Sequence, residues 1–242
     1  MPTPDELLAA LTVGEKAAMT AGADVWHATG CARLGIAGLK MTDGPSGARG
    51  AGFTDSTSAC FPCGTALAAT WDPALVREVG AALGEEARTK GARVLLAPTV
   101  NLHRTPIGGR NFEAYSEDPH LAARTAAAFV EGVQRAGVAT TVKHLVANDQ
   151  EHDRMTVSVE VDERALRELY LVPFEAAVRE AGSWGVMAAY NRLDGTYCCE
   201  HPWLLTDLLK REWGFEGFVV SDWFATHSTV PAALAGLSDR GV

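Results

Sequence analysis

The chain has 242 residues, enough for one large domain or two small ones, and its 47% apolar and 21% charged residues exclude disordered and fibrous proteins. The 30 Asp and Glu residues outnumber the 21 Lys and Arg residues, so the net charge is −9. Because such a chain repels phosphate groups, we expect no nucleic-acid and no membrane partner, whereas a neutral polyol substrate remains possible.

Helix start and stop signals alternate with short apolar runs along the chain. A capping-box spacing, Asp-Pro pairs at helix starts and glycines at helix ends mark the helices. In chain order we predict a helix beginning at residues 3–6, a strand at 38–43, a helix at 72–91, a strand at 93–100, a helix at 118–137, a strand at 138–145, a helix at 162–182 that bends at Pro173, a strand at 185–190, a helix at 201–214 and a strand at 218–223.

Continuous apolar strands separated by helices are typical of a parallel sheet that is buried on both faces. Two α/β architectures fit this pattern, a (β/α) barrel and a doubly wound sheet. The doubly wound alternative favours a glycine-rich nucleotide loop after the first strand. The loop at residues 44–52 is rich in glycine but lacks the GxGxxG order and a following Walker lysine, so the pattern favours a TIM-like (β/α) barrel.

Polar side chains follow the predicted strands, and in a barrel all these strand ends open on one face. Asp43 ends the first strand, Arg110 follows the second, and Lys143 with His144 ends the third. The others are Arg154, Tyr190, Asp222 and Trp223. Cations and carboxylates beside an indole suit a polyhydroxylated ring, because they bind hydroxyl groups while the indole covers C–H groups.

Each residue also has a structural interpretation. Asp222 can be a helix cap or turn residue, and Lys143 and His144 a structural hydrogen-bonding pair. Arg110 can pair on the surface with Glu113 or Glu117. Tyr190 and Trp223 can be core residues.

Several segments resemble glycoside hydrolase family 3, in particular its β-glucosidase branch. They are TDGPSG (42–47), FPCGTALAATWDP (61–73), GRNFEAYSEDP (109–119), TVKHLVANDQEHDR (141–154), VMAAYNRLDG (186–195) and GFVVSDW (217–223). The resemblance runs in order from about residue 5 to residue 237. It implies retaining hydrolysis of terminal β-D-glucosyl residues through a covalent glycosyl–enzyme intermediate.

The resemblance also implies roles for individual residues. The family's nucleophile falls on Asp222. Its sugar-contacting residues fall on Asp43, Arg110, Lys143, His144, Arg154, Met187 and Tyr190. Trp223 is expected to add an apolar face, and the partner is expected to be a β-glucoside or related small saccharide.

Two departures from the family bear on activity. In the β-glucosidase branch the acid/base is a glutamate from a second, C-terminal α/β domain, and this chain ends at Val242. The hexosaminidase branch uses a histidine in a PGHG loop that is absent here, so His152 is not assigned that role, and Glu151 and Asp153 are expected in a substrate loop or on the surface. A last strand bearing L-E-M-P is replaced by LSDRGV.

We therefore expect residues 1–242 to be the N-terminal barrel domain alone, truncated at its last strand, weak or inactive by itself, and possibly complemented by a separate C-terminal domain. Two alternatives remain open. One is a non-catalytic sugar-binding remnant, and the other is a barrel aldolase or lyase that uses Lys143 as a Schiff base. The sequence does not separate glucose from xylose, nor does it identify the aglycone.

The five cysteines are odd in number and predict no disulfide framework. Cys60 and Cys63 have CxxC spacing, but the adjacent Cys198 and Cys199 do not supply the second half of a zinc site, so we expect buried thiols, no metal and no cofactor. The N-terminus lacks a basic start and an apolar core, and no apolar run approaches the ~18 residues of a membrane span. These features predict a cytoplasmic protein.

Overall fold

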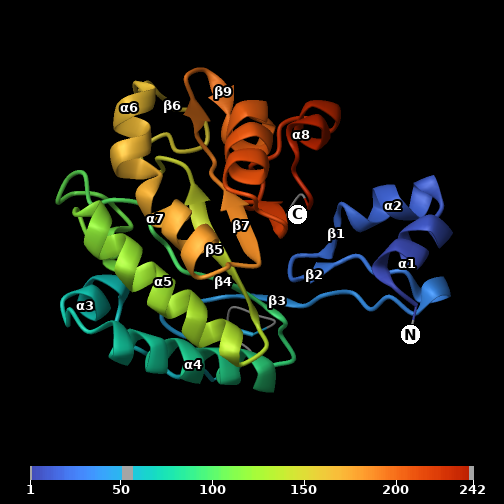
Figure 1. Cartoon of the computed structure of the whole chain (residues 1–242), viewed down its shortest axis with the longest axis horizontal. Helices are drawn as coiled ribbons and strands as arrows, with labels where there is room; N and C mark the ends of the chain where they lie inside the picture. The colour runs from blue at the N-terminus through green and yellow to red at the C-terminus, as the bar shows by residue number, and fades with distance from the viewer. Residues whose placement is uncertain (1, 51–56, 240–242) are drawn as a thin grey trace.

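The computed structural model describes residues 2–50 and 57–239, and its centre is a five-stranded parallel sheet (Figure 1). In spatial order the strands are β3 (Met41–Asp43), β4 (Val94–Leu96), β5 (Ala139–Leu145), β7 (Gly185–Ala188) and β10 (Phe218–Ser221). This order equals the chain order, whereas a doubly wound sheet reverses direction at a switch point. The prediction of a (β/α)-barrel fold is confirmed, and the described strands form an open part of the barrel.

The helices between the strands begin where the sequence predicts. Asp72 caps α4 (Pro73–Thr89) by accepting hydrogen bonds from the backbone N–H groups of the first turn, and Asp118 caps α5 (Pro119–Arg135) in the same way. Figure 1 shows α4 and α5 side by side along one side of the sheet. The later helices are η6 (Trp203–Glu212) and α8 (Val230–Ala235).

The helix predicted at 162–182 is present, and its hydrogen-bond pattern changes on both sides of Pro173. It comprises α6 (Glu163–Ala165), η3 (Leu166–Tyr170), α7 (Val172–Glu175) and η4 (Ala176–Glu180). In η3 and η4 the backbone forms wide turns, in which an N–H donates to the carbonyl five residues earlier, as Leu171 does to Leu166. The short regular helix α7, which contains Pro173, separates the two wide-turn segments.

Several short elements of two to seven residues were not predicted, because runs this short show little or no periodicity. In the N-terminal part, α1 (Pro4–Ala10) begins with the predicted capping box and is followed by α2 (Val13–Met19), the hairpin of β1 (Gly22–Asp24) and β2 (His27–Ala28), and η1 (Ala32–Leu34). Beyond them lie α3 (Gly64–Ala68), η2 (Asn111–Glu113), η5 (Cys198–Glu200) and a small sheet of β6 (Ser158–Val159), β8 (Arg192–Leu193) and β9 (Thr196–Tyr197).

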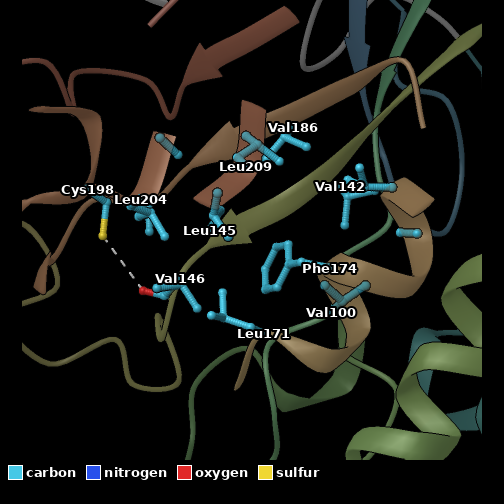
Figure 2. Packing of buried hydrophobic residues seen from close by; sticks show 14 of the residues in the cluster. Val100, Val142, Leu145, Val146, Leu171, Phe174, Val186, Cys198, Leu204 and Leu209 are labelled. Atoms are coloured by element: carbon cyan, nitrogen blue, oxygen red, sulfur yellow. Dashed lines mark hydrogen bonds between the residues drawn. The ribbon is translucent and has the colours of Figure 1, made fainter. Parts of the chain in front are cut away.

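The main core lies between the sheet and the helices that follow β5 and β7. Every residue of β5 is buried, and Figure 2 shows Phe174 of α7 pointing toward this strand among Val142, Leu145 and Leu171. The Cys198 thiol points to the carbonyl oxygen of Val146 at 3.8 Å. A strand buried on both faces explains why β5 has no alternation of apolar and polar residues.

The cysteines differ from the expectation in one respect. Cys31, Cys198 and Cys199 are buried free thiols, but Cys60 is exposed and Cys63 partly exposed, so the prediction of buried thiols for the CFPC segment is wrong. The segment before α3 is irregular, and Phe61 between the two cysteines packs against the core. Over residues 2–50 and 57–239, no cluster of three His, Cys, Asp or Glu residues could hold a metal ion, and no helix is long and apolar enough to span a membrane.

The glycine-rich loop after β3 forms a tight turn. Gly44 has φ +132°, and a Cβ atom there would lie 1.7 Å from the carbonyl oxygen of Gly47. Arg49 donates its backbone N–H to the carbonyl of Asp43, which holds the loop against the strand end. The loop residues 51 and 52 lie outside the described part of the chain.

We expected the last strand of the barrel to be missing after residue 237, but the described end of the chain begins to pair with β10. Asp239 forms a parallel bridge with Val220, and the Ser221 N–H donates to the Asp239 carbonyl at 3.0 Å. The chain thus enters the next strand position of the barrel at Asp239.

Helices α4 and α5 approach closely because glycines lie at their contact. A Cβ atom on Gly132 would lie 2.2 Å from the Arg77 carbonyl oxygen, and one on Gly80 would lie 2.7 Å from the Phe129 carbonyl oxygen. Both obstacles are backbone atoms, so the helices would have to separate to admit a methyl group.

We predict that Gly132→Ala lowers the free energy of unfolding by about 1–3 kcal/mol or more, the usual cost of overpacking. Gly14→Ala is the matched control, because a Cβ atom on this helical glycine meets nothing within 4 Å of the described structure. The control should stabilise the chain by up to about 1 kcal/mol through helix propensity. Urea unfolding of both variants checks the prediction, and equal stabilities would contradict it.

Candidate active site

A pocket of about 400 Å³ opens at the carboxyl ends of the parallel strands. It is lined by all nine residues predicted from the sequence, namely Asp43, Arg110, Lys143, His144, Arg154, Met187, Tyr190, Asp222 and Trp223, and also by Val25, Trp26, Leu96 and Phe224. The barrel thus brings together side chains that are up to 180 positions apart, because parallel strands end on one face.

One ion pair joins the first and third strands of the sheet. The Lys143 Nζ lies 2.9 Å from Asp43 Oδ1, and Lys143 is only 4% exposed. Burial opposes ionisation of Asp43, but the Lys143 ammonium and Arg49, 3.5 Å away, outweigh it, so the pKa of Asp43 lies below its ordinary value. Asp43 is therefore a carboxylate that accepts hydrogen bonds at neutral pH.

His144 lies beside Lys143 on β5 and is held by Asn101. Its ring Nδ1 is 3.1 Å from Asn101 Oδ1, and its Nε2 is 3.4 Å from Asp222 Oδ2. Burial lowers the pKa of His144 well below its ordinary value, and the positive charges of Arg110, Lys143 and Arg154 lower it further. The imidazole is therefore neutral at physiological pH.

Asp222 follows β10 and is 8% exposed. Its Oδ1 accepts the backbone N–H of Trp223 at 2.8 Å, whereas Oδ2 has no hydrogen-bond partner among the described residues. Burial raises the pKa of Asp222 more than Lys143, the backbone N–H of Trp223, Arg110 and the Tyr190 hydroxyl lower it, so this pKa lies above its ordinary value.

Two arginines on loops complete the polar wall. Arg110 forms an ion pair with Glu113, which is only 7% exposed and also accepts a hydrogen bond from the Thr99 hydroxyl at 3.0 Å. The alternative in which Arg110 pairs on the surface is therefore wrong, since this pair is inside the site. Arg154 donates to Glu151 at 2.5 Å, and its guanidinium lies 4.6 Å from the centre of the Tyr190 ring.

Aromatic residues close one side of the pocket. The Trp223 indole N–H donates to the Val25 carbonyl at 3.0 Å, and its ring centre lies 5.9 Å from that of Trp26. Phe224 lines the pocket yet is 68% exposed, with a φ of +67°. Sequence reasoning missed Val25, Trp26 and Phe224; the only signal for Trp26 was an aromatic residue outside the repeated units.

The loop after β5 separates its charged residues. His152 and Asp153 are exposed and pair with one another at 3.2 Å, away from the pocket. Glu151 instead lies 4.0 Å from Arg110 and lines a small cavity next to the pocket. Asp153 is therefore a surface residue, as one of its two interpretations expected, while Glu151 supports the arginines.

The pocket offers buried charged groups that can bind several hydroxyl groups, an indole face for C–H groups, and one carboxylate oxygen without a partner. This combination suits a sugar ring with a nucleophile near its anomeric carbon. A nucleotide site is not supported, because the cations are already paired with carboxylates.

Comparison with known proteins gives a consistent family. The chain is 55% identical over 235 residues to a β-glucosidase of Rhizobium radiobacter and 50% identical over 234 residues to a probable β-glucosidase J of Aspergillus fumigatus, each match covering 96% of this chain. The match spans 29% and 27% of those two proteins. The chain is thus under a third of the length of these relatives.

Solved structures agree in fold. β-Glucosidase 3B from Thermotoga neapolitana matches with a TM-score of 0.93 and 43% identity, over 98% of this chain and 36% of that one. The β-glucosidase from Kluyveromyces marxianus matches with a TM-score of 0.96 and 43% identity, over 98% of this chain and 28% of that one. The family model for the glycosyl hydrolase family 3 N-terminal domain matches residues 20–238. With a barrel sheet, a pocket at its carboxyl end and this match over most of its length, the chain belongs to glycosyl hydrolase family 3.

Proposed function

We propose that this pocket binds terminal β-D-glucosyl residues and cleaves their glycosidic bonds with retention, using Asp222 as the nucleophile. The observation that carries the proposal is the uncommitted Oδ2 of Asp222 in a pocket of paired cations and carboxylates. The relatives named β-glucosidase, and the two solved neighbours in complex with glucose, support the substrate class.

The proposed reaction has two displacements. Oδ2 attacks C1 and forms an ester bond while the bond from C1 to the leaving oxygen breaks, and that oxygen takes a proton from a general acid. Water then attacks C1 and gives a proton to the same group, and the ester bond breaks to regenerate the carboxylate. The backbone N–H of Trp223 donates a hydrogen bond to Oδ1, which leaves Oδ2 for the reaction.

The general acid is proposed to come from outside the pocket's described lining. Asp43 is the only carboxyl group besides Asp222 among those lining residues, and its lowered pKa keeps it ionised. His144 is neutral because its pKa is lowered. A glutamate from a complementing C-terminal domain, as the family resemblance implies, would meet this need.

The Schiff-base alternative is disfavoured by the contacts of Lys143. A Schiff base requires a neutral amine with access to a carbonyl carbon. The Lys143 ammonium is instead engaged by Asp43 at 2.9 Å and is almost completely buried. A sugar-binding remnant would share the pocket but not form a covalent intermediate.

We predict that a 2-deoxy-2-fluoro-β-glucoside with a dinitrophenolate leaving group labels Asp222, because this leaving group departs without a proton. Mass spectrometry of peptides should find one fluoroglucosyl group on Asp222. Asp222→Asn should abolish labelling, while Asp207→Asn, an exposed residue paired with Arg211, should label normally. Binding of glucose without labelling would instead favour the sugar-binding remnant.

We predict that the chain turns over cellobiose barely or not at all and cleaves activated aryl glucosides slowly. Relative to an enzyme that has its general acid, the rate of glycosidic cleavage should be ~10²–10⁴ lower, which is the usual contribution of general acid–base catalysis. The rate should rise steeply as the leaving group becomes more acidic. Product analysis across a series of substituted phenyl glucosides tests this, and a flat series with ordinary cellobiose turnover would contradict it.

We predict that Asp222→Asn raises the melting temperature at pH 7. A buried carboxyl whose pKa is raised binds protons more tightly in the folded chain, so stability decreases as pH rises from the ordinary pKa of 3.8 through the raised value. The amide removes this loss, so the gain in melting temperature should be larger at pH 7 than at pH 4. Scanning calorimetry at both pH values checks this, and a variant whose melting temperature at pH 7 is equal to or lower than that of the unsubstituted chain would refute the prediction.

Labelling of the unsubstituted chain by the fluoroglucoside should decrease as pH falls through the same window, because the protonated carboxyl group of Asp222 cannot attack C1.

A further inference from the structure

Asn101 is fixed in one orientation by two backbone groups of His144. Its Oδ1 accepts the His144 N–H at 2.8 Å, and its Nδ2 donates to the His144 carbonyl at 2.9 Å. Turning the amide over would place two donors 2.8 Å apart and two acceptors 2.9 Å apart. The atom facing the imidazole is therefore the amide oxygen.

The amide oxygen determines which ring nitrogen carries the proton. Oδ1 lies 3.1 Å from Nδ1, and an oxygen has no proton to donate. A bare Nδ1 would set its lone pair against Oδ1 at 3.1 Å, which is closer than the 3.4 Å between Nε2 and Asp222 Oδ2, so the shorter contact favours the proton on Nδ1. In a neutral ring this leaves Nε2 as a bare acceptor.

The bare Nε2 faces a second acceptor. Asp222 Oδ2 lies 3.4 Å from it and has no hydrogen-bond partner among the described residues. The Nε2–Oδ2 contact is not a hydrogen bond, and two acceptors cannot satisfy each other, so one donor placed between them would satisfy both. The charged groups around the ring, Arg110, Lys143 and Arg154, oppose a second proton on the imidazole.

We propose that Asn101 is a positioning residue that holds His144 in the Nδ1–H tautomer, so that Nε2 and Asp222 Oδ2 form a paired acceptor site for one donating hydroxyl group. That this hydroxyl belongs to a sugar rests on the proposed function. His144 then accepts a hydrogen bond from the substrate instead of donating one. Asn101 contacts His144 and is 6% exposed, so it acts through the histidine.

The tautomer can be measured without any sugar. Long-range ¹H–¹⁵N spectra of the ¹⁵N-labelled full chain distinguish a protonated from a bare ring nitrogen, and the signals of His144 are those missing in His144→Gln. We expect a neutral ring at pH 7 with its proton on Nδ1. A ring protonated on Nε2, or on both nitrogens, would overturn the proposal.

Substitution tests whether Asn101 is the cause. Asn101→Ala should shift the tautomer ratio toward Nε2–H by on the order of fivefold, the effect of one neutral hydrogen bond. Asn101→Asp keeps the acceptor and should retain Nδ1–H while raising the pH at which the ring takes up a second proton. Should Asn101→Ala fail to fold, the aspartate variant and the unsubstituted chain still decide the matter. An Asn101→Asp ring with its proton on Nε2 refutes the role of Asn101.

Asn191→Ala is the matched control. Asn191 is also a buried asparagine that donates to a backbone carbonyl, that of Val146 at 3.1 Å, but none of its side-chain hydrogen bonds goes to His144. It should reduce stability without moving the His144 tautomer. A tautomer shift equal to that of Asn101→Ala would show that loosening of the fold, and not Asn101, controls the ring.

Adding glucose separates this inference from the proposed function. A hydroxyl donating to Nε2 should move the ¹⁵N signal of Nε2 while the proton stays on Nδ1. If the free chain shows Nδ1–H but glucose changes nothing, the positioning role stands and the proposed sugar site fails. If glucose moves the proton to Nε2, the acceptor site is wrong and the sugar site stands.

Discussion

Every charge enclosed at the end of the barrel needs a partner, and this constraint organises the pocket. Three ion pairs lie around the pocket, and in each pair a carboxylate neutralises one cation. The pairs are Lys143–Asp43, Arg110–Glu113 and Arg154–Glu151. Asp222 is the carboxylate left outside these pairs: burial raises its pKa, and its Oδ2 has no hydrogen-bond partner among the described residues.

The pairing also divides the work of the site. A carboxylate tied to a lysine stays ionised and binds hydroxyl groups, as Asp43 can, but it cannot deliver a proton at neutral pH. Asp222, the proposed nucleophile, receives only partial compensation from the cations around it. The cost of burying it is a local loss of stability, which active sites commonly carry for function.

Asn101 has a corresponding role beside the neutral imidazole of His144. His144 lies among cations that keep it uncharged, so its role depends on where its one proton resides. An amide that is oriented by backbone bonds fixes that proton more reliably than a rotatable hydroxyl would. The backbone of His144 in β5 thus orients the Asn101 amide, and the amide determines which nitrogen of the His144 ring can accept a hydrogen bond in the pocket.

The amino-acid sequence by itself determined the alternation of helices and buried strands, because caps such as Asp72 and Asp118 and the apolar run of β5 are local signals. It also determined which polar residues follow the strands, and with parallel strands in chain order these had to meet on one face. Only the tertiary structure decided which charges pair. Several carboxylates are near Arg110 in the sequence, and the fold pairs it with the buried Glu113. It alone brought Trp26, in the turn between β1 and β2, beside Trp223, placed Asn101 against His144, and made burial outweigh the cations at Asp222. These outcomes depend on distances and desolvation between segments far apart in the chain, and no local pattern encodes them.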